Sequence, residues 1–121
     1  MGEGEGEIRN VSSLIFNMPN NWNIPNKLEE KVRARDKNCV YCHVKMKTSG
    51  VSSKTRATWE HIDNNEKNIS KENIALCCNS YNASKGAKRL ATWFKSSYCL
   101  NKGINKKTVA IQIRRHIKDT G

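Results

Sequence analysis

The sequence predicts a small α+β domain, with two short strands set among helices and a pair of cysteines ahead of the first strand. Three observations lead to this class. The length of 121 residues suits one domain with a modest hydrophobic core. Two short runs of β-branched, aromatic and aliphatic residues lie between segments whose apolar residues recur at helical spacing. Of the five cysteines, two are separated by two residues, a spacing typical of metal-binding turns.

The first part of the chain is expected to be an arm followed by a short helix. Residues 1–26 combine a Gly-Glu repeat with short apolar pieces among many asparagines, which predicts a flexible, acidic and Asn-rich arm. A helix over residues 27–36 follows, because Asn26 is placed to cap it and Glu29 lies at the third position after the cap.

The two strands come next. Residues 55–62 are rich in β-branched and aromatic side chains, and residues 74–78 form a short apolar run, so both segments are expected as strands. The polar segment 63–72 between them is expected as a loop, with Asn64 and Asn65 at its turn.

Helices are expected in the last third of the chain. From Asn79 to Phe94 the apolar residues fit helical spacing, with Gly86 as a weak point. Between residues 105 and 118 they recur at four-residue steps. We therefore expect residues 101–121 to contribute a basic C-terminal helix packed on the domain.

The charge of the chain is strongly positive and unevenly distributed. Lysine and arginine number 22 against 11 acidic residues, a formal net charge of +11. Residues 1–26 carry a net charge of −2, and the remaining 95 residues carry +13. Between Asn73 and Lys118 there are ten basic residues and no acidic one. A surface of one sign repels itself and is usually tolerated where a polyanion binds, so we expect a nucleic-acid partner.

Composition also excludes some functions. No apolar run approaches the ~18 residues that a membrane span needs, and neither a signal-peptide pattern nor a lipidation motif is present, so no membrane role is expected. An odd number of cysteines favours metal ligands or buried thiols in a reducing cytoplasm over a disulfide framework. The expected location is cytoplasmic.

The cysteines predict a structural zinc site. Cys39 and Cys42 form a turn that can present two sulfurs to one tetrahedral ion, and Cys78 begins the second half of such a site. The fourth ligand stays open, because Tyr81 stands where a second pair would be completed and a neutral phenol is a poor ligand. The alternatives for that position are His43, Cys77 and Cys99. The competing interpretation is a set of buried thiols without metal.

A Glu-His pair ends the first strand and an Asn precedes the second. Phosphodiester hydrolysis needs a base that deprotonates water and a cation against the phosphate. His61 has a suitable reference pKa near 6.5. Glu60 and His61 are neighbours in a strand, so their side chains converge only if the strand end twists or bulges.

The order of these residues resembles the HNH endonuclease family. The resemblance rests on a cysteine pair, Glu-His at a strand end, Asn-Ile-Ala-Leu opening the next strand, a further cysteine, and Asn-Ala-Ser-Lys-Gly in the following helix. It covers residues 27–100 and implies an HNH nuclease domain there, a small ββα-metal fold with a Cys-pair knuckle and flanking helices. Glu60 stands where Asp or His is common, and Asn82 stands where the final His of the family name would be.

The resemblance implies a role for four residues. His61 would be the general base, and Asn73 would hold its ring in orientation. Glu60 and Asn82 would ligate one Mg²⁺ or Mn²⁺ through oxygen atoms, which suit a hard ion. The implied activity is a metal-dependent DNA endonuclease of restriction or phage type, which leaves a 5′-phosphate and a 3′-hydroxyl.

Basic side chains are expected to hold the DNA backbone. Contacts of this kind position a duplex without reading its sequence, and they weaken with salt. Six residues are candidates, on the helix that carries Asn82 or on the last helix: Lys85, Lys88, Arg89, Lys95, Arg114 and Arg115.

The sequence leaves open two alternative functions and, for a DNA nuclease, the way in which it selects its cutting sites. The chain could be a non-catalytic zinc-ribbon module that only binds nucleic acid, or a nuclease acting on RNA. A chain this small either cuts with little sequence preference or forms a homodimer that reads a palindrome.

Overall fold

The structure, a computed structural model, describes residues 22–120, with side chains described for residues 22–118. The expected arm therefore lies outside the described residues up to residue 21. The α+β class is confirmed, with helices around a two-stranded antiparallel sheet. The elements are, in order, α2 (Asn26–Arg35), β1 (Ala57–His61), β2 (Ile74–Cys78), α3 (Asn79–Lys85), α4 (Leu90–Phe94), α5 (Ser97–Lys102) and α6 (Ile111–Thr120).

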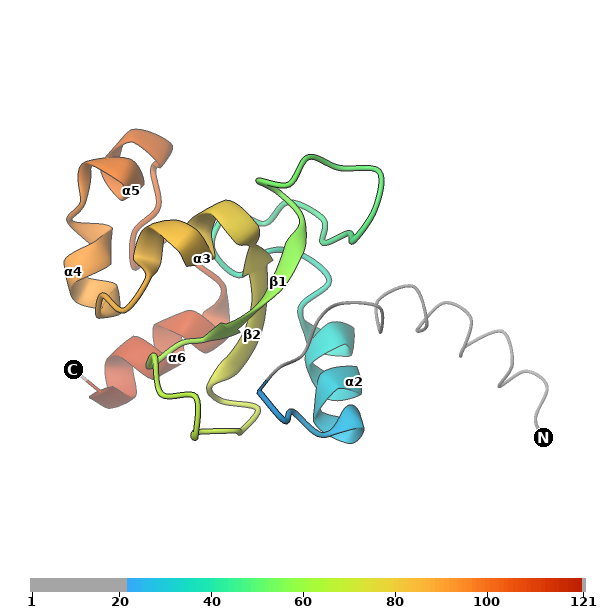
Figure 1. Cartoon of the computed structure of the whole chain (residues 1–121). Helices are drawn as coiled ribbons and strands as arrows, with labels where there is room; N and C mark the ends of the chain where they lie inside the picture. The colour runs from blue at the N-terminus through green and yellow to red at the C-terminus, as the bar shows by residue number, and fades with distance from the viewer. Residues whose placement is uncertain (1–21, 121) are drawn as a thin grey trace, which may run out of the picture.

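The strands β1 and β2 form the centre of the fold. They pair antiparallel, with Ala57 opposite Cys78 and His61 opposite Ile74. Figure 1 shows α2 on one side of this hairpin and α3 with the later helices on the other side. All five residues of β2 are buried, because both faces of that strand are covered. This explains why β2 appears in the sequence as a continuous apolar run.

The sheet separates two hydrophobic clusters. The smaller cluster joins α2 to one face of the hairpin and includes Val32, Trp59 and Leu76. The larger cluster lies on the other face and includes Cys77, Trp93 and Ile113. Alternation along the strands produces this division, because successive side chains point to opposite faces.

Helix boundaries differ from the prediction at three places. Pro25, and not Asn26, occupies the N-cap of α2, and no side chain caps this helix. The run expected from Asn79 to Phe94 is interrupted at Gly86, whose φ of +53° ends α3. The last helix begins at Ile111 and not at residue 105. Local spacing marks the apolar face of a helix better than it marks its ends.

The knuckle is the segment around the first cysteine pair, and it is anchored on two sides. It is closed by a bridge between Asn38 and Lys45. The backbone N–H of Val40 donates to Leu76 of β2 at 3.1 Å, and Val40 accepts a bond from Ala110 ahead of α6 at 2.8 Å. These bonds position the knuckle beside the end of β2.

A buried carboxylate ties α2 to β2 and α6. Asp36 follows α2, and its Oδ2 accepts a bond from the backbone N–H of Leu76 at 3.1 Å. Its Oδ1 accepts bonds from the side-chain amide of Gln112 and from Arg35 Nε. Since the Asp36 side chain has no accessible surface, these donors take the place of the water molecules that would hydrate an exposed carboxylate.

Replacing Asp36 with alanine is expected to lower the free energy of unfolding by about 3 kcal/mol, because buried donors would lose their acceptor. Denaturant unfolding followed by circular dichroism measures the change. Glu30, an exposed residue of α2, provides the control, and its alanine variant should stay within about 0.5 kcal/mol of the original chain. Equal midpoints for the two variants would contradict a stabilising role of the Asp36 contacts.

Candidate functional site

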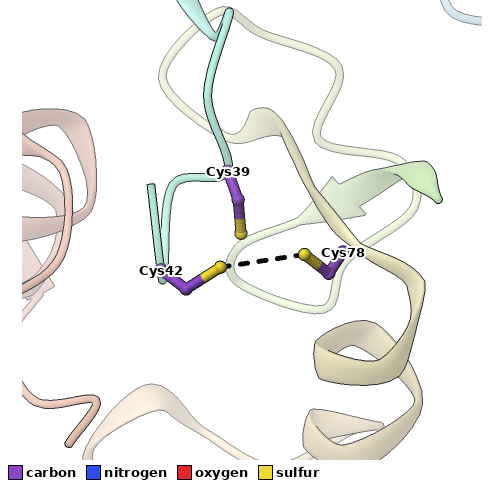
Figure 2. A group of neighbouring side chains, drawn as sticks. All are labelled: Cys39, Cys42 and Cys78. Carbon is purple, nitrogen blue, oxygen red and sulfur yellow. Dashed lines mark hydrogen bonds between the residues drawn. The ribbon is translucent and has the colours of Figure 1, made fainter. Parts of the chain in front are cut away.

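Three cysteines meet beside the end of β2. Cys39 and Cys42 come from the knuckle and Cys78 is the last residue of β2, and Figure 2 shows their sulfurs pointing toward one another. All three sulfurs lie within 4.8 Å of one another, and those of Cys42 and Cys78 are 3.8 Å apart. We call these residues the Cys trio. Three converging thiols can hold a metal ion, and such soft ligands fit zinc.

Hydrogen bonding within the Cys trio shifts the pKa values of its thiols. A hydrogen bond from Cys78 lowers the pKa of Cys39 to about 6. The same interaction raises the pKa of Cys78, so the two thiols do not ionise independently. A thiolate is the form that binds metal.

The structure distinguishes the four candidates for a fourth ligand. Tyr81 lies against the Cys trio, and its pKa is raised by burial and by its hydrogen bond with Cys42. The ring of His43 instead bonds the carbonyl of Thr108 at 2.6 Å. The sulfurs of Cys77 and Cys99 lie outside the group that converges. Of the four candidates, Tyr81 is the one whose side chain interacts with all three thiols.

A second centre lies at the end of β1, where a cavity of about 250 Å³ opens. We call it the β1 cavity. Consecutive residues of β1 line it, which is possible because β1 has one edge that β2 does not cover. The cavity brings Glu60, His61 and Asn82 together, three of the four residues that the resemblance assigns to catalysis.

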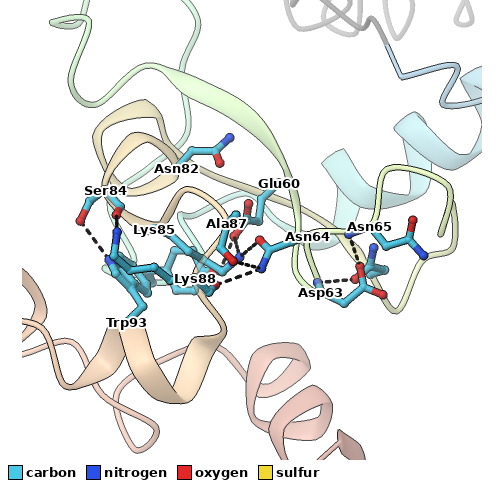
Figure 3. A network of polar contacts seen from close by, with 12 residues as sticks. Glu60, Asp63, Asn64, Asn65, Asn82, Ser84, Lys85, Ala87, Lys88 and Trp93 are labelled. Atoms are coloured by element: carbon cyan, nitrogen blue, oxygen red, sulfur yellow. Dashed lines mark hydrogen bonds and ion pairs between the residues drawn. The ribbon is translucent and has the colours of Figure 1, made fainter.

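Glu60 occupies the inner side of the β1 cavity and is only 2% exposed. Its Oε2 accepts a hydrogen bond from the Tyr41 hydroxyl at 2.7 Å and lies 3.2 Å from Lys85 Nζ. Figure 3 shows Glu60 and Lys85 within one polar network that continues to Asn64. Burial raises the pKa of Glu60, and the charge of Lys85 counteracts that effect.

His61 faces the opposite side of β1. Its ring packs edge-on against Trp22, with ring centroids 5.5 Å apart. The residue is 7% exposed, and its buried Nε2 has no hydrogen-bond partner among residues 22–118. Burial lowers the pKa of His61, which favours the neutral imidazole. A buried ring nitrogen without a partner is costly, so it indicates a site for a proton donor such as water.

The side chain of Asn73 makes its hydrogen bonds to the backbone of the loop after β1, and among the described residues none of them reaches the ring of His61. Its Oδ1 accepts a bond from the backbone N–H of Asp63 at 2.8 Å, and its Nδ2 donates to the carbonyl of Asn68 at 3.0 Å. The backbone N–H of Ile62 donates to the Asn73 carbonyl at 2.9 Å. These bonds fix the chain directly after His61.

The donors around the β1 cavity fit a hard divalent cation. Asn82 uses its amide nitrogen to donate to the carbonyl of Trp59 at 2.9 Å, so the amide oxygen is the atom left for a ligand. Both polar contacts of Glu60 involve Oε2, which leaves Oε1. One carboxylate and one amide oxygen on the same cavity are the ligand types that Mg²⁺ and Mn²⁺ prefer.

The structure separates the predicted DNA contacts into two groups. Lys85 does not fit the prediction, because it is fully buried and its ammonium faces Glu60 and Asn64. A side chain without accessible surface cannot contact a phosphate in this conformation. The other five candidates are exposed, namely Lys88, Arg89, Lys95, Arg114 and Arg115.

Three residues of this region had no role assigned at the site from the sequence. Tyr41 reaches Glu60 from the knuckle, 19 positions away. Asn64 has a φ of +66° and connects the loop after β1 to Ala87 and Lys88 through its amide. Trp22 covers His61. Only Asn64 carried a local signal, as a turn residue that tolerates positive φ.

Neither a protein-family model, nor a curated protein, nor a solved structure matches this chain. Within residues 22–120, no helix combines the length and apolar character that a membrane span requires.

Proposed function

We propose that the chain is a metal-dependent DNA endonuclease with a ββα-metal (HNH) active site in the β1 cavity. The observation that carries this proposal is that His61, whose buried Nε2 has no hydrogen-bond partner among the described residues, lines the same cavity as Glu60 and Asn82. The sequence resemblance, in which the same three residues have catalytic roles, supports it.

In this proposal His61 takes a proton from the attacking water. Its Nε2 makes no hydrogen bond within the described part of the chain, and burial lowers the pKa of His61, so the neutral ring is available as a base. Asn73 would position His61 indirectly, by fixing the loop that begins at Ile62. Water would then form the new bond to phosphorus while the bond to the 3′-oxygen breaks, leaving a 5′-phosphate and a 3′-hydroxyl.

Glu60 and Asn82 would hold the divalent cation, Mg²⁺ or Mn²⁺, through Oε1 and the amide oxygen. Such a cation supplies positive charge that stabilises the phosphate and the leaving oxygen. The Cys trio would hold a separate structural zinc ion and, with it, keep the knuckle attached to the end of β2.

The exposed cations would hold the DNA backbone. Lys88 and Arg89 come after α3 and directly after Gly86 and Ala87, which line the β1 cavity. Arg114 and Arg115 lie on α6. These charges bind phosphates without selecting a base sequence. Restriction or phage-type cutting at defined sites would therefore need a homodimer or a further segment that contacts base edges.

Replacing Arg114 and Arg115 together with glutamine is expected to weaken DNA binding and to reduce its salt dependence by about two phosphate contacts, since each contact releases counterions. Fluorescence anisotropy over a range of salt concentrations measures both effects. The matched control changes Lys27 and Lys31, two exposed lysines of α2, to glutamine. An equal loss in both double variants would indicate a net-charge effect and not an interface on α6.

The direct test of the proposed activity is incubation of supercoiled plasmid with the protein in Mg²⁺, in Mn²⁺ and in EDTA. Conversion to nicked or linear DNA that requires the metal is the expected result. RNA digested in parallel determines the preferred nucleic acid. Absence of conversion in both metals, with DNA binding retained, would overturn the proposed activity.

The second candidate is a zinc-ribbon module that binds nucleic acid without cutting it. The polar contacts of Glu60 favour it, because Tyr41 and Lys85 already satisfy one oxygen of this carboxylate. The Nε2 of His61 favours the nuclease, because it has no partner within residues 22–118 and buried histidine nitrogens are usually hydrogen-bonded. The plasmid experiment distinguishes the two candidates.

A further inference from the structure

A fully buried lysine lies beside the proposed metal ligands. Lys85 is the last residue of α3, and its relative exposure is 0%. Its Nζ lies 3.2 Å from Glu60 Oε2 and donates a hydrogen bond to Asn64 Oδ1 at 2.6 Å. Figure 3 shows the lysine reaching from its helix toward Glu60 and Asn64. The ammonium thus joins α3, β1 and the loop after β1.

This placement has an electrostatic reason. A lysine at a helix end can usually extend into solvent, where its charge is hydrated. Burying Lys85 is favourable only if a buried opposite charge compensates for the lost hydration. Glu60 is that charge, since it is itself 2% exposed. Each residue therefore serves as the counterion of the other within the described part of the molecule.

The two oxygens of Glu60 have different surroundings. Lys85 and the Tyr41 hydroxyl both contact Oε2. Oε1 makes neither contact. Glu60 itself lines the β1 cavity together with Asn82 and His61. A divalent cation on Oε1 would share one carboxylate with the ammonium of Lys85. Two cations on one carboxylate repel each other, and burial strengthens that repulsion.

We infer that Lys85 is a built-in counterion that holds Glu60 in place when no metal is bound and weakens the affinity of the β1 cavity for a divalent cation. Lys85 is thus a positioning residue that acts through Glu60. The inference rests on the proposed function, because it takes Glu60 as a metal ligand.

Titration of the zinc-loaded protein with Mn²⁺, followed by electron paramagnetic resonance, tests this inference without an activity assay. Lys85→Met removes the charge and keeps most of the length of the unbranched side chain, and it is expected to bind Mn²⁺ about tenfold tighter than the original chain. Lys67→Met is the matched control. It removes the same charge from an exposed position in the loop after β1 and should leave the affinity within about twofold. Glu60→Gln should remove this Mn²⁺ site in both the original and the Lys85→Met background.

Thermal melting gives a second, independent result. Without Mn²⁺ the Lys85→Met variant should melt at a lower temperature than the original chain, because Glu60 is left buried without its counterion. Added Mn²⁺ should raise its melting temperature by more than that of the original chain, since the metal replaces the missing charge. If Lys85→Met does not fold alone, Mn²⁺ should restore its folding, and Lys85→Gln provides a neutral variant that keeps a donor for Asn64.

The outcomes separate the two proposals. If Glu60→Gln removes Mn²⁺ binding but Lys85→Met binds Mn²⁺ equally or more weakly, the inference about Lys85 is overturned and Glu60 remains a metal ligand. If Glu60→Gln leaves Mn²⁺ binding unchanged, the proposed function fails, and the inference fails with it. If both neutral variants stay unfolded with Mn²⁺ present, Lys85 is a purely structural residue and the inference is wrong.

Discussion

Replacing His61 with alanine is expected to abolish metal-dependent plasmid cleavage while leaving DNA binding nearly unchanged. A general base contributes about 10²- to 10⁴-fold to a rate, and the loss should be at least of that order. Binding should persist, because the phosphate contacts come from exposed lysines and arginines that are distinct from His61. Time courses on supercoiled plasmid measure the rate, and anisotropy with a labelled duplex measures the affinity.

His116 provides the matched control for this experiment. It is the histidine of α6, it lies outside the β1 cavity, and its alanine variant should cleave at a rate close to that of the original chain. Full cleavage by the His61→Ala variant would remove His61 from the mechanism. Loss of binding together with cleavage would instead indicate that the substitution disturbs the fold around Trp22.

Replacing Cys78 with alanine is expected to remove about one zinc ion per chain and to lower the melting temperature by at least about 15 °C. Three sulfurs converge from the knuckle and from β2, so a bound ion would connect two segments that are 36 positions apart at Cys42 and Cys78. Without one of these ligands, the connection between knuckle and sheet depends on backbone hydrogen bonds, on the Tyr41–Glu60 hydrogen bond and on core packing. Metal analysis and differential scanning calorimetry of the same preparations measure both effects.

Cys99 is the control for this substitution. It is a fully buried thiol outside the Cys trio, so Cys99→Ala should cost only lost packing, about 1 kcal/mol, and should retain zinc. A Tyr81→Cys variant supplies a fourth thiol and should retain zinc longer against a chelator than the original chain. Equal melting temperatures for the Cys78 and Cys99 variants, with no zinc in the original protein, would show that the trio is a group of buried thiols.

Much of the fold follows from local patterns in the chain. The bounds of β2 agree with the expected segment 74–78, because a short apolar run between polar loops has few other structures available. The helix after β2 begins where it was expected, at Asn79, but it ends at Gly86 because the backbone there takes a positive φ. The last helix begins six residues later than expected, since Val109 continues the four-residue spacing of Ile113 and Ile117 without belonging to the helix.

The candidate site was predictable by residue type more than by geometry. Glu60 and His61 were both identified from the sequence, and their divergence across the strand was expected. That both still line one cavity depends on the uncovered edge of β1, which no spacing in the sequence encodes. Asn73 was assigned to the histidine ring, whereas its hydrogen bonds go to the loop backbone.

The sequence by itself determined the α+β class, the position of the hairpin and the identity of the three cysteines that converge. These follow from composition, apolar periodicity and the spacing of ligands, all of which are local properties of a chain. Only the tertiary structure decided that Lys85 points inward to Glu60, and that Tyr81 stands beside the Cys trio. The physical reason is that the direction of a charged side chain depends on whether a counterion is buried within its reach. For Lys85 that counterion lies on a strand that precedes it, and folding alone brings the two together.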